Sequence, residues 1–425
     1  MKKIKIILGL IILGIFSVLL NAEENKKNGE YTLEKVVILS RHGLRAPLST
    51  PGSTLSKVTP YEWVAWDVEA SYLTKKGVRL EVNFGQYMSE WLDQNGIKTS
   101  KLKEEEALVY TNSLQRTIAT GQALAAGMFP GTNIKSIHKM EIGKFDPVFN
   151  PQIRTADKMV LEEFASQMEL EKANKELDEA YKILNRVINY KNSELCLKEK
   201  KCNFSEDNGK ITLAKDKEPS VTGVIRIGTQ IADALLLQYY EGDPINKIAN
   251  GNIKTNKEWK LINDIKNKYG DLLFASNKSA AHIAKPLIEY MNSEFENDNR
   301  KVVVLVGHDS NAASVLSALE VKPYILENQH ETTPIGSKIF FEIWKNNRTN
   351  EKKVKIEYIY QTTNQIRSGE IINLKNKPMH KILELKNCPI DKDGYCPYEK
   401  FDNIIKDFSS ILADVEALSH CALFW

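Results

Sequence analysis

The sequence has little net charge and no strong bias in composition. Its 58 Lys and Arg residues nearly match its 55 Asp and Glu residues, for a net charge of +3. This near balance argues against a dedicated nucleic-acid-binding protein, which carries a strong basic excess on at least one face. A hydrophobic content of 42% excludes a disordered chain, and 22 glycines in 425 residues exclude a collagen-like repeat. A folded protein of one or two domains remains, which must bind acidic small molecules through a local cluster of positive charge.

Long hydrophobic runs are absent after residue 22. Before it, three lysines within the first five residues precede an apolar or small stretch at 6–20, followed by Asn21 and Ala22. This order is typical of a secretory signal peptide, which we interpret as cleaved after Ala22. The alternative is an uncleaved membrane anchor, because Leu20 is bulkier than the usual residue two positions before the cut. A run of roughly 15 apolar residues is short for a membrane span. We therefore expect a secreted protein with no membrane association after signal cleavage.

Cysteine is also scarce, and export decides how the five residues are interpreted. Cys196 and Cys202 lie six residues apart, and Cys388 and Cys396 lie eight residues apart. In an oxidising compartment these separations predict two short-range disulfides. The alternative is metal ligation, but no histidine and no Cys-x-x-Cys pair lies near either couple, so we predict no zinc site. Cys421 is left without a predicted partner.

Short apolar runs outline the fold. Three of them, at 36–39, 107–110 and 302–306, are rich in β-branched residues and continuous, as expected of parallel strands covered on both faces. Helical patterns follow two of these runs, at 114–127 and 311–319. Strand followed by helix predicts an α/β protein with a mostly parallel sheet core flanked by helices.

The character of the sequence changes between about 155 and 285. Long amphipathic runs at 160–190 and 225–240 occur there with no convincing strand, which indicates a mostly helical insertion. Alternating runs at 339–344 and 354–360 then predict a hairpin at the edge of the sheet. The predicted organisation is a signal peptide at 1–22, an α/β catalytic domain at 23–154 and 286–425, and a helical insertion domain at 155–285.

The first candidate site follows the first predicted strand, as Arg-His-Gly-Leu-Arg-Ala-Pro at 41–47. Open α/β sheets bind ligands at the carboxyl ends of their strands. Arginine forks match phosphate oxygens, so Arg41 and Arg45 would form an oxyanion clamp around His42 as nucleophile. Gly43 would let the backbone approach the ligand closely. The alternative, which we favour for an isolated Arg-His pair, is a basic loop paired with surface carboxylates.

Two further turns shift this balance. The strand at 302–306 leads into His308 and Asp309, so two neighbouring parallel strands would present His42 and Asp309 to the same crevice. Asp309 could instead only cap its helix, although Ser310 or Asn311 could do the capping. The third turn, after the strand at 107–110, would place Arg116 in the first turn of a helix capped by Asn112 or Ser113, where the helix dipole favours an anion. Taken alone, Arg116 would be a solvated helix arginine.

Together these turns resemble those of the histidine acid phosphatases with an early Arg-His-Gly-x-Arg-x-Pro loop and a late His-Asp pair. Within that family the chain is most similar to the bacterial periplasmic glucose-1-phosphatases, and the likeness extends over nearly the whole mature chain to about residue 407. The motifs that carry it are Asn-Ser-Leu-Gln-Arg-Thr at 112–117, Phe-Asp-Pro-Val-Phe-Asn-Pro at 145–151, Tyr-Tyr-Glu-Gly at 239–242, Val-Gly-His-Asp-Ser-Asn at 306–311 and Cys-Pro-Ile-Asp at 388–391. The related phytases share the catalytic motifs and fewer of the others.

The resemblance implies a periplasmic phosphatase that hydrolyses glucose 1-phosphate, with an α/β core and a helical second domain. His42 would attack phosphorus to give a phosphohistidine, while the guanidinium groups and one imidazole hold the nonbridging oxygens. The residues with this binding role would be Arg41, Arg45, Arg116 and His308. Asp309 would donate a proton to the leaving sugar oxygen, and it must start protonated, so an acid pH optimum follows. No cofactor or metal would be needed, because the arginines supply the positive charge.

One further residue comes from the resemblance. Glu241 would face the substrate and restrict what fits, and the alternative is a solvated carboxylate at a helix end before Gly242. Gly43 stands where the glucose-1-phosphatases tend to have asparagine and the phytases have glycine, so a phytase or a broad-specificity acid phosphatase is the alternative function. The subgroup's disulfide between the regions of 101 and 132 is absent, since neither region has cysteine.

Two other classes of protein fit the motifs less well. A secreted sugar-phosphate-binding protein would have two similar lobes and no need of Asp309 beside a leaving group. A phosphotransferase similar to phosphoglycerate mutase would share the nucleophilic histidine loop, but such enzymes work in the cytoplasm and lack the His-Asp pair. The expected partner is a small phosphomonoester rather than a nucleic acid, and nothing in the sequence predicts an oligomeric state.

Overall fold

The computed structural model describes residues 30–48, 53–200, 202 and 204–412. The predicted signal peptide at 1–22, Cys421 and most of the tail after 411 lie outside these described residues. None of the helices in the described part of the chain is long and apolar enough to cross a membrane.

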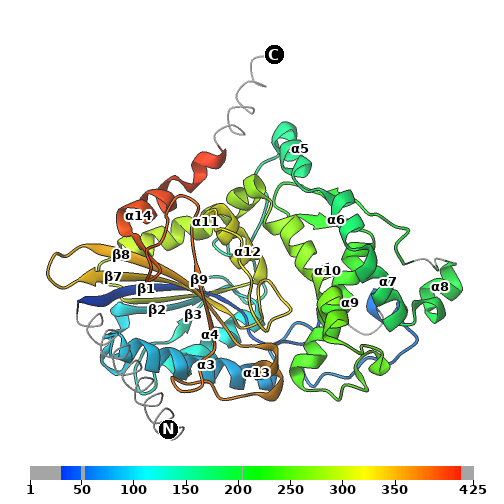
Figure 1. Cartoon of the computed structure of the whole chain (residues 1–425), viewed down its shortest axis with the longest axis horizontal. Helices are drawn as coiled ribbons and strands as arrows, with labels where there is room; N and C mark the ends of the chain where they lie inside the picture. Colours follow the sequence, from blue (N-terminus) through cyan, green and yellow to red (C-terminus); the bar gives the residue numbers. More distant parts are fainter. Residues whose placement is uncertain (1–29, 49–52, 201, 203, 413–425) are drawn as a thin grey trace, which may run out of the picture.

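An eight-stranded mixed sheet forms one side of the molecule (Figure 1). Four of its strands run parallel in the order β3 (Ser136–Ile137), β2 (Ala107–Thr111), β6 (Val302–Gly307) and β1 (Tyr31–Arg41). The hairpin of β7 (Lys338–Asn346) and β8 (Lys352–Tyr360) continues it antiparallel to β1. The predicted parallel core and hairpin are confirmed. The hairpin is not the edge, however, because β9 (Met379–Leu383) and β10 (Tyr395–Pro397) both pair with β8.

Both faces of the parallel strands are buried, which explains their continuous apolar runs. Val36 and Ile38 pack into the core on one face, whereas Val37 and Leu39 pack into the core on the other. Helices α3 (Lys75–Gln94) and α4 (Gln115–Met128) cover the first face. Helices α11 (Asn277–Glu296), α12 (Asp309–Ala318) and α14 (Tyr398–Asp407) cover the second (Figure 1). The predicted helices at 114–127 and 311–319 thus correspond to α4 and α12.

A mostly helical segment lies beside the sheet (Figure 1). Its helices are α5 (Lys158–Ser166), α6 (Leu170–Glu176), α7 (Asp178–Val187), α8 (Glu194–Glu199), α9 (Val224–Glu241) and α10 (Asn256–Phe274). The long run predicted at 160–190 is thus divided among three helices and a short 3₁₀ turn. The segment also contains a strand pair that was not predicted, β4 (Ile211–Thr212) with β5 (Ser220–Val221), because two-residue strands are too short to show a period of two.

The helical segment has no sharp end toward the sheet. The predicted division at 285 falls inside α11, a helix that contacts both α10 and β1. The domain boundaries therefore stay a prediction. Two short helices, α2 (Thr54–Lys57) and α13 (Thr363–Ser368), complete the α-helices of the described residues. Both predicted disulfides are confirmed: one joins Cys196 to Cys202 and the other joins Cys388 to Cys396.

Candidate active site

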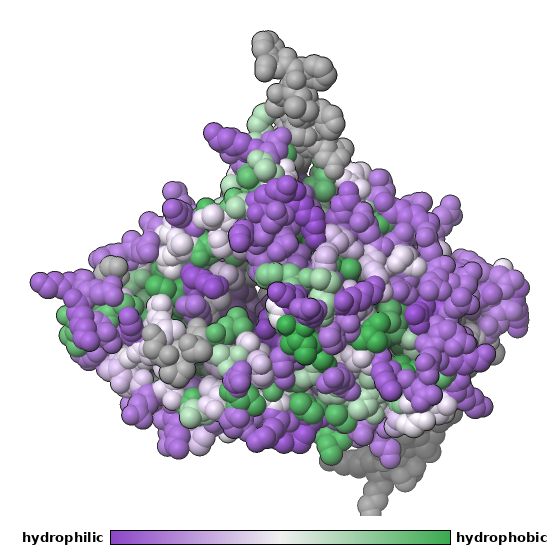
Figure 2. Space-filling view, turned by 180° about the vertical axis from the view of Figure 1, so that it is seen from behind, coloured by the Kyte–Doolittle hydropathy of each residue, from purple (hydrophilic) through white to green (hydrophobic). Residues whose placement is uncertain are grey.

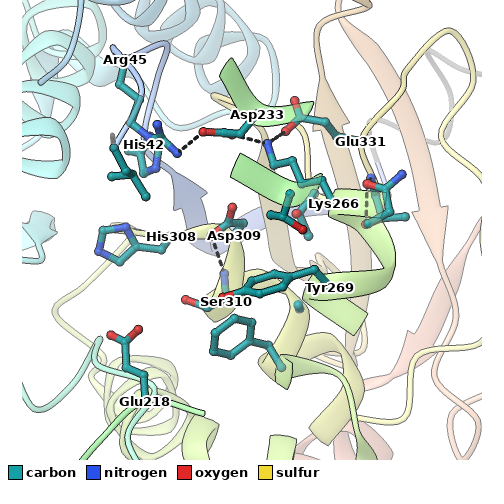
Figure 3. A pocket seen from close by; sticks show the side chains of 18 of the residues that line it. His42, Arg45, Glu218, Asp233, Lys266, Tyr269, His308, Asp309, Ser310 and Glu331 are labelled. Carbon is teal, nitrogen blue, oxygen red and sulfur yellow. Dashed lines mark hydrogen bonds and ion pairs between the residues drawn. The ribbon is translucent and has the colours of Figure 1, made fainter. Parts of the chain in front are cut away.

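The ends of β1 and β6 bring the two predicted histidine turns together. Arg41 pairs with Gly307 in the parallel register, and the His42 N–H donates to the Gly307 carbonyl at 3.0 Å. The rings of His42 and His308, one residue beyond, have centroids 5.6 Å apart. The predicted juxtaposition of the two turns is confirmed. Figure 3 shows both rings at one side of a pocket, with Asp309 beside them.

This pocket has a volume of about 300 Å³. Of the seven residues predicted for the site, five line it: His42, Arg45, Arg116, His308 and Asp309. Arg41 lies immediately behind and is 1% exposed. The volume of the pocket is at the small end of the range for small-molecule sites.

His42 is held as a neutral imidazole. Its Nδ1 lies 2.9 Å from the Gly43 carbonyl oxygen, which can only accept, so Nδ1 carries the proton and Nε2 keeps a lone pair. Burial, followed by the charges of Arg116 and Arg41, lowers the pKa of His42 well below its usual value. An unprotonated Nε2 is the form that attacks an electrophile.

A buried network of carboxylates and one lysine orients two of the arginines. Arg45 Nη2 lies 3.1 Å from Asp233 Oδ2. Arg41 Nη1 lies 2.7 Å from Glu331 Oε1. The ammonium of Lys266 bridges the two carboxylates, 2.8 Å from Asp233 Oδ1 and 2.7 Å from Glu331 Oε1 (Figure 3). Both arginine side chains are thereby fixed by planar, charge-assisted contacts.

The third arginine has no ion-pair contact in the described part of the chain, and only the more distant charges of Asp309 and Glu218 offset part of its burial. Arg116 has no acidic partner within ion-pair distance among the described residues, and burial together with Arg45 lowers its pKa to about 10. Moreover, the Nε atoms of Arg41, Arg45 and Arg116 are all buried with no hydrogen-bond partner in the described part of the chain. Buried donors are normally paired, so three orphaned guanidinium donors indicate a site for an anion that the protein itself does not supply.

Asn112 sets the tautomer of His308. Its Oδ1 accepts from the Ser113 N–H at 2.8 Å, so its Nδ2 is the atom 2.8 Å from His308 Nε2. An imidazole nitrogen that accepts leaves the proton of a neutral ring on the other nitrogen. His308 Nδ1 thus carries the proton, and it lies 3.4 Å from Arg116 Nη2. The imidazole therefore adds one more N–H donor beside the arginines.

Local capping differs partly from the sequence prediction. Arg116 lies in the first turn of α4 as predicted, but Leu114 is the N-cap residue. Asn112 and Ser113 do not cap, because Asn112 binds His308 and the Ser113 hydroxyl donates to the Lys144 carbonyl at 2.7 Å. In α12, the predicted role of Asn311 is confirmed, since its Oδ1 accepts from the His308 N–H at 2.9 Å.

Asp309 is more accessible than Arg41 and Arg45, with 40% of its side chain exposed against 0% and 5%. Its Oδ2 lies 3.1 Å from Arg41 Nη2. Burial would raise the pKa of Asp309, but Arg41, Lys266 and Arg45 outweigh it and lower the pKa to about 2. The expectation that Asp309 starts protonated therefore does not hold for the ligand-free site, because the positive charges that await the anion stabilise its carboxylate.

Packing gives a further reason for glycine at 43, since a Cβ there would lie 2.7 Å from Glu81 Cγ. One other expectation is corrected. Glu241 does not line the pocket: its Oε2 accepts from the Thr74 hydroxyl at 2.9 Å, at the end of α9. Gly242, with a φ of 101°, ends α9 directly after Glu241.

Glu218 is a carboxylate that does line the pocket and that the sequence analysis missed. It lies in the loop before β5, apart from Arg45 in Figure 3. Burial, followed by the charge of Asp309, raises its pKa. Nothing in its polar surroundings marks it in the sequence. By contrast, Asp233 did carry a signal, as the only charged residue between Arg226 and Glu241 in a largely apolar stretch of α9.

No group of three or more His, Cys, Asp or Glu side chains that could hold a metal ion occurs among the described residues. The arrangement instead combines a neutral nucleophilic imidazole, fixed cationic donors and an accessible carboxyl group. Such a set can stabilise a phosphoryl group during its transfer.

Known proteins share this sequence and fold. A glucose-1-phosphatase of Salmonella typhimurium is 41% identical over 380 residues, 88% of this chain and 92% of that protein. A glucose-1-phosphatase of Providencia rettgeri is also 41% identical, over 383 residues and the same shares. Among solved structures, the apo form of the Hafnia alvei phytase matches with a TM-score of 0.82 and 26% identity, covering 89% of this chain and 97% of that one.

These likenesses confirm the predicted fold class and family resemblance. They also confirm the predicted class of enzyme, a phosphoric monoester hydrolase. The model of the histidine phosphatase superfamily (branch 2) matches residues 32–361, where both histidine turns and Arg116 lie. The chain therefore belongs to the histidine phosphatase superfamily, in its second branch.

Proposed function

We propose that this enzyme hydrolyses glucose 1-phosphate to glucose and phosphate through a phosphohistidine on His42. The observation that carries this proposal is the set of three orphaned arginine Nε donors around a neutral, buried histidine. The relatives that are 41% identical are glucose-1-phosphatases, which supports the substrate. Export to the periplasm rests on the predicted signal peptide.

The reaction has two steps. In the first, Nε2 of His42 attacks phosphorus, the bond from phosphorus to the sugar oxygen breaks, and Asp309 gives that oxygen a proton. In the second, Asp309 takes a proton from water, whose oxygen attacks phosphorus and releases His42 and inorganic phosphate. Arg41, Arg45 and Arg116 stabilise the nonbridging oxygens throughout.

Asp309 acquires its proton only with the substrate bound. The phosphate offsets the positive charges that lower the pKa of this carboxyl group, so the pKa rises toward the working range. A mildly acid medium then supplies the proton, while the lowered pKa of His42 keeps the nucleophile unprotonated. An acid optimum follows from the substrate complex rather than from the free enzyme.

The small pocket and Glu218 favour a substrate with one phosphate. A carboxylate on the pocket wall repels further phosphate groups, as on an inositol polyphosphate, and accepts hydrogen bonds from sugar hydroxyls. A phytase is the second candidate, supported by the likeness to the Hafnia alvei phytase.

Phosphate release by the purified mature chain tests the proposal. Glucose 1-phosphate, phytate and an aryl phosphate are compared in EDTA at acid and neutral pH, with His42→Ala as the inactive control. We expect acid-favoured release that is strongest on glucose 1-phosphate and is lost in the variant. A preference for phytate would support the mechanism and change the proposed substrate. Tight binding of these compounds without release of phosphate would contradict the proposed hydrolysis. Quenching in alkali, in which the phosphorus–nitrogen bond survives, should trap phosphohistidine only when His42 is present.

A further inference from the structure

We propose that Lys266 is a positioning residue that keeps Arg41 and Arg45 available to the phosphate group of the substrate. It does so by sharing the two buried carboxylates, Asp233 and Glu331, that would otherwise neutralise these arginines. The inference deepens the proposed function and rests on it, because it concerns the same arginine clamp. Lys266 itself lies outside the sequence motifs at 41–47, 112–117 and 306–311.

Lys266 contacts both carboxylates from α10, where it lines the catalytic pocket with only 12% of its side chain exposed. Its Nζ lies 2.8 Å from Asp233 Oδ1 and 2.7 Å from Glu331 Oε1 (Figure 3). Asp233 also contacts Arg45 at 3.1 Å. Glu331 contacts Arg41 at 2.7 Å through the same Oε1 atom that Lys266 approaches. Each carboxylate is therefore divided between the lysine and one arginine of the clamp.

These ion pairs form one chain of alternating charge. Arg41 extends the chain at one end, because its Nη2 lies 3.1 Å from Asp309 Oδ2. The groups then follow in the order Asp309, Arg41, Glu331, Lys266, Asp233 and Arg45. Three cations balance three carboxylates in this chain. Without Lys266, three carboxylates would face two guanidinium groups, and the excess negative charge would repel an anion in the adjoining pocket.

Both shared carboxylates are ionised, although both are buried. Burial would raise the pKa of Asp233, but Arg45 and Lys266 outweigh burial and lower this pKa. Burial would likewise raise the pKa of Glu331, but Lys266 and Arg41 outweigh it. Each carboxylate therefore contributes a full negative charge to the chain, and Lys266 offsets part of it.

Other contacts hold α10 in place, so Lys266 is not needed for that purpose. The neighbouring Asn267 binds the loop before β7, since its Nδ2 donates to the His330 carbonyl at 2.8 Å and its Oδ1 accepts from the Thr332 N–H at 3.1 Å. Ile262 of the same helix is fully buried in the hydrophobic core. We therefore expect loss of the lysine to change the balance of charge and to leave the packing of α10 intact.

Calorimetric titration with inorganic phosphate tests the inference, because it measures the arginine clamp without turnover. Lys266→Met should raise the Kd for phosphate about tenfold, since the chain then carries excess negative charge. KM for an aryl phosphate should rise by a similar factor while kcat changes less, as expected when binding of the ground state and the transition state is weakened alike. Lys268→Met is the matched control and should leave Kd unchanged, because this α10 lysine pairs with Glu176 at the surface at 2.6 Å.

A second substitution separates charge from packing. Asp233→Asn in the Lys266→Met background removes one carboxylate, restores the balance of the chain and keeps an oxygen that can accept from Arg45. This double variant should recover most of the lost affinity for phosphate. Lys266→Gln, which keeps a donor and loses the charge, should bind phosphate as weakly as Lys266→Met and covers the case in which the methionine variant does not fold.

Two results would contradict the inference. One is that the charge-removing variants of Lys266 bind phosphate as tightly as Lys268→Met, and the other is that the double variant binds no better than they do. Failure of the proposed function would be observed differently, as a wild-type enzyme that releases no phosphate from any phosphomonoester.

Discussion

Two buried clusters of charge flank the loop that carries His42, and they differ in how completely their donors are paired. In the catalytic cluster, the Nε atoms of Arg41, Arg45 and Arg116 lack acceptors among the described residues. In the second cluster, the Lys338 ammonium donates to Glu81 Oε2 at 2.9 Å and to the Gly336 carbonyl at 2.6 Å. The first cluster is open to a ligand, whereas the second is closed.

Burial acts against the charged form in both clusters. It lowers the pKa of Lys338 and raises that of Glu81, and each partner offsets part of the effect on the other. In the catalytic cluster, the same cost falls on Arg116 without an acidic partner in ion-pair contact. A closed pair therefore supports the loop, because both charges are satisfied, while an open cluster stores positive potential for an anion.

The largest effect is expected from emptying the open cluster. Arg116→Ala should lower kcat/KM about 10³-fold, because it removes donors aimed at the phosphoryl group. The melting temperature should not fall, since an uncompensated buried charge is lost with the side chain. Arg226→Ala is the matched control, because this pocket arginine already donates to the Tyr269 hydroxyl at 2.8 Å. Equal losses of rate in the two variants would remove the distinction between open and paired arginines.

Breaking the closed cluster should act on stability instead. Lys338→Met leaves Glu81 buried and unpaired, so the free energy of unfolding should fall by about 3 kcal/mol in denaturant titrations. The double variant Glu81→Leu/Lys338→Met should recover much of this loss. Lys172→Met provides the exposed control, since the ion pair of Lys172 with Glu169 is at the surface. If the Lys338 variant is no less stable than this control, the pair does not support the loop.

His282, a buried and hydrogen-bonded histidine outside the site, should make the stability of the protein depend on pH. The Arg154 N–H donates to His282 Nε2 at 2.9 Å, and burial lowers the pKa of His282 to about 4. In the unfolded chain His282 has its ordinary pKa of about 6.5, so it is protonated at a higher pH than in the folded chain. Folding must then release this proton, and the free energy of unfolding falls as the pH falls from 6.5 toward 4. The contribution is about 2 kcal/mol lower at pH 5 than at pH 7.

His282→Gln keeps an acceptor for Arg154 and does not titrate. Its free energy of unfolding should therefore vary less than that of the wild type between pH 7 and pH 5. Parallel urea titrations at both pH values measure the difference. If the free energies of unfolding of the variant and the wild type change equally between pH 7 and pH 5, His282 does not cause the pH dependence.

The smallest effect is expected at the wall of the open cluster. Glu218→Gln should raise the ratio of activity on phytate to activity on glucose 1-phosphate about fivefold, because repulsion of the additional phosphates is removed. In the wild type this ratio should rise as the pH falls, since the raised pKa of Glu218 lets its carboxyl group lose its charge at a higher pH than an ordinary glutamate does. The ratio in the variant should be independent of pH. Glu241→Gln is the matched control and should leave this ratio and its pH dependence unchanged.

The two histidine turns could be predicted from sequence because each follows a continuous apolar run. The runs at 36–39 and 302–306 form adjacent strands, and adjacency in a parallel sheet brings their carboxyl ends together. Glu241 was misplaced because the family motif around it fixes a position in the chain and not the direction of a side chain at a helix end. Glu218 was missed because its loop has no periodicity.

The sequence by itself predicted the reaction class, through its resemblance to a known family. It also predicted the arginine clamp, since local hydrophobic patterns place the motif residues at strand and helix ends. Tertiary structure alone decided which carboxylates reach that clamp. Asp233, Lys266 and Glu331 come from α9, α10 and the loop after α12, and they meet Arg41 and Arg45 only after the helical segment packs beside the sheet (Figures 1 and 3).

Hydrophilic side chains dominate the face of the molecule in Figure 2, with hydrophobic side chains among them. Whether a charge is paired or open depends on neighbours far away in the chain and on the water that folding removes. Both are properties of the packed molecule, and no local pattern of residues encodes them.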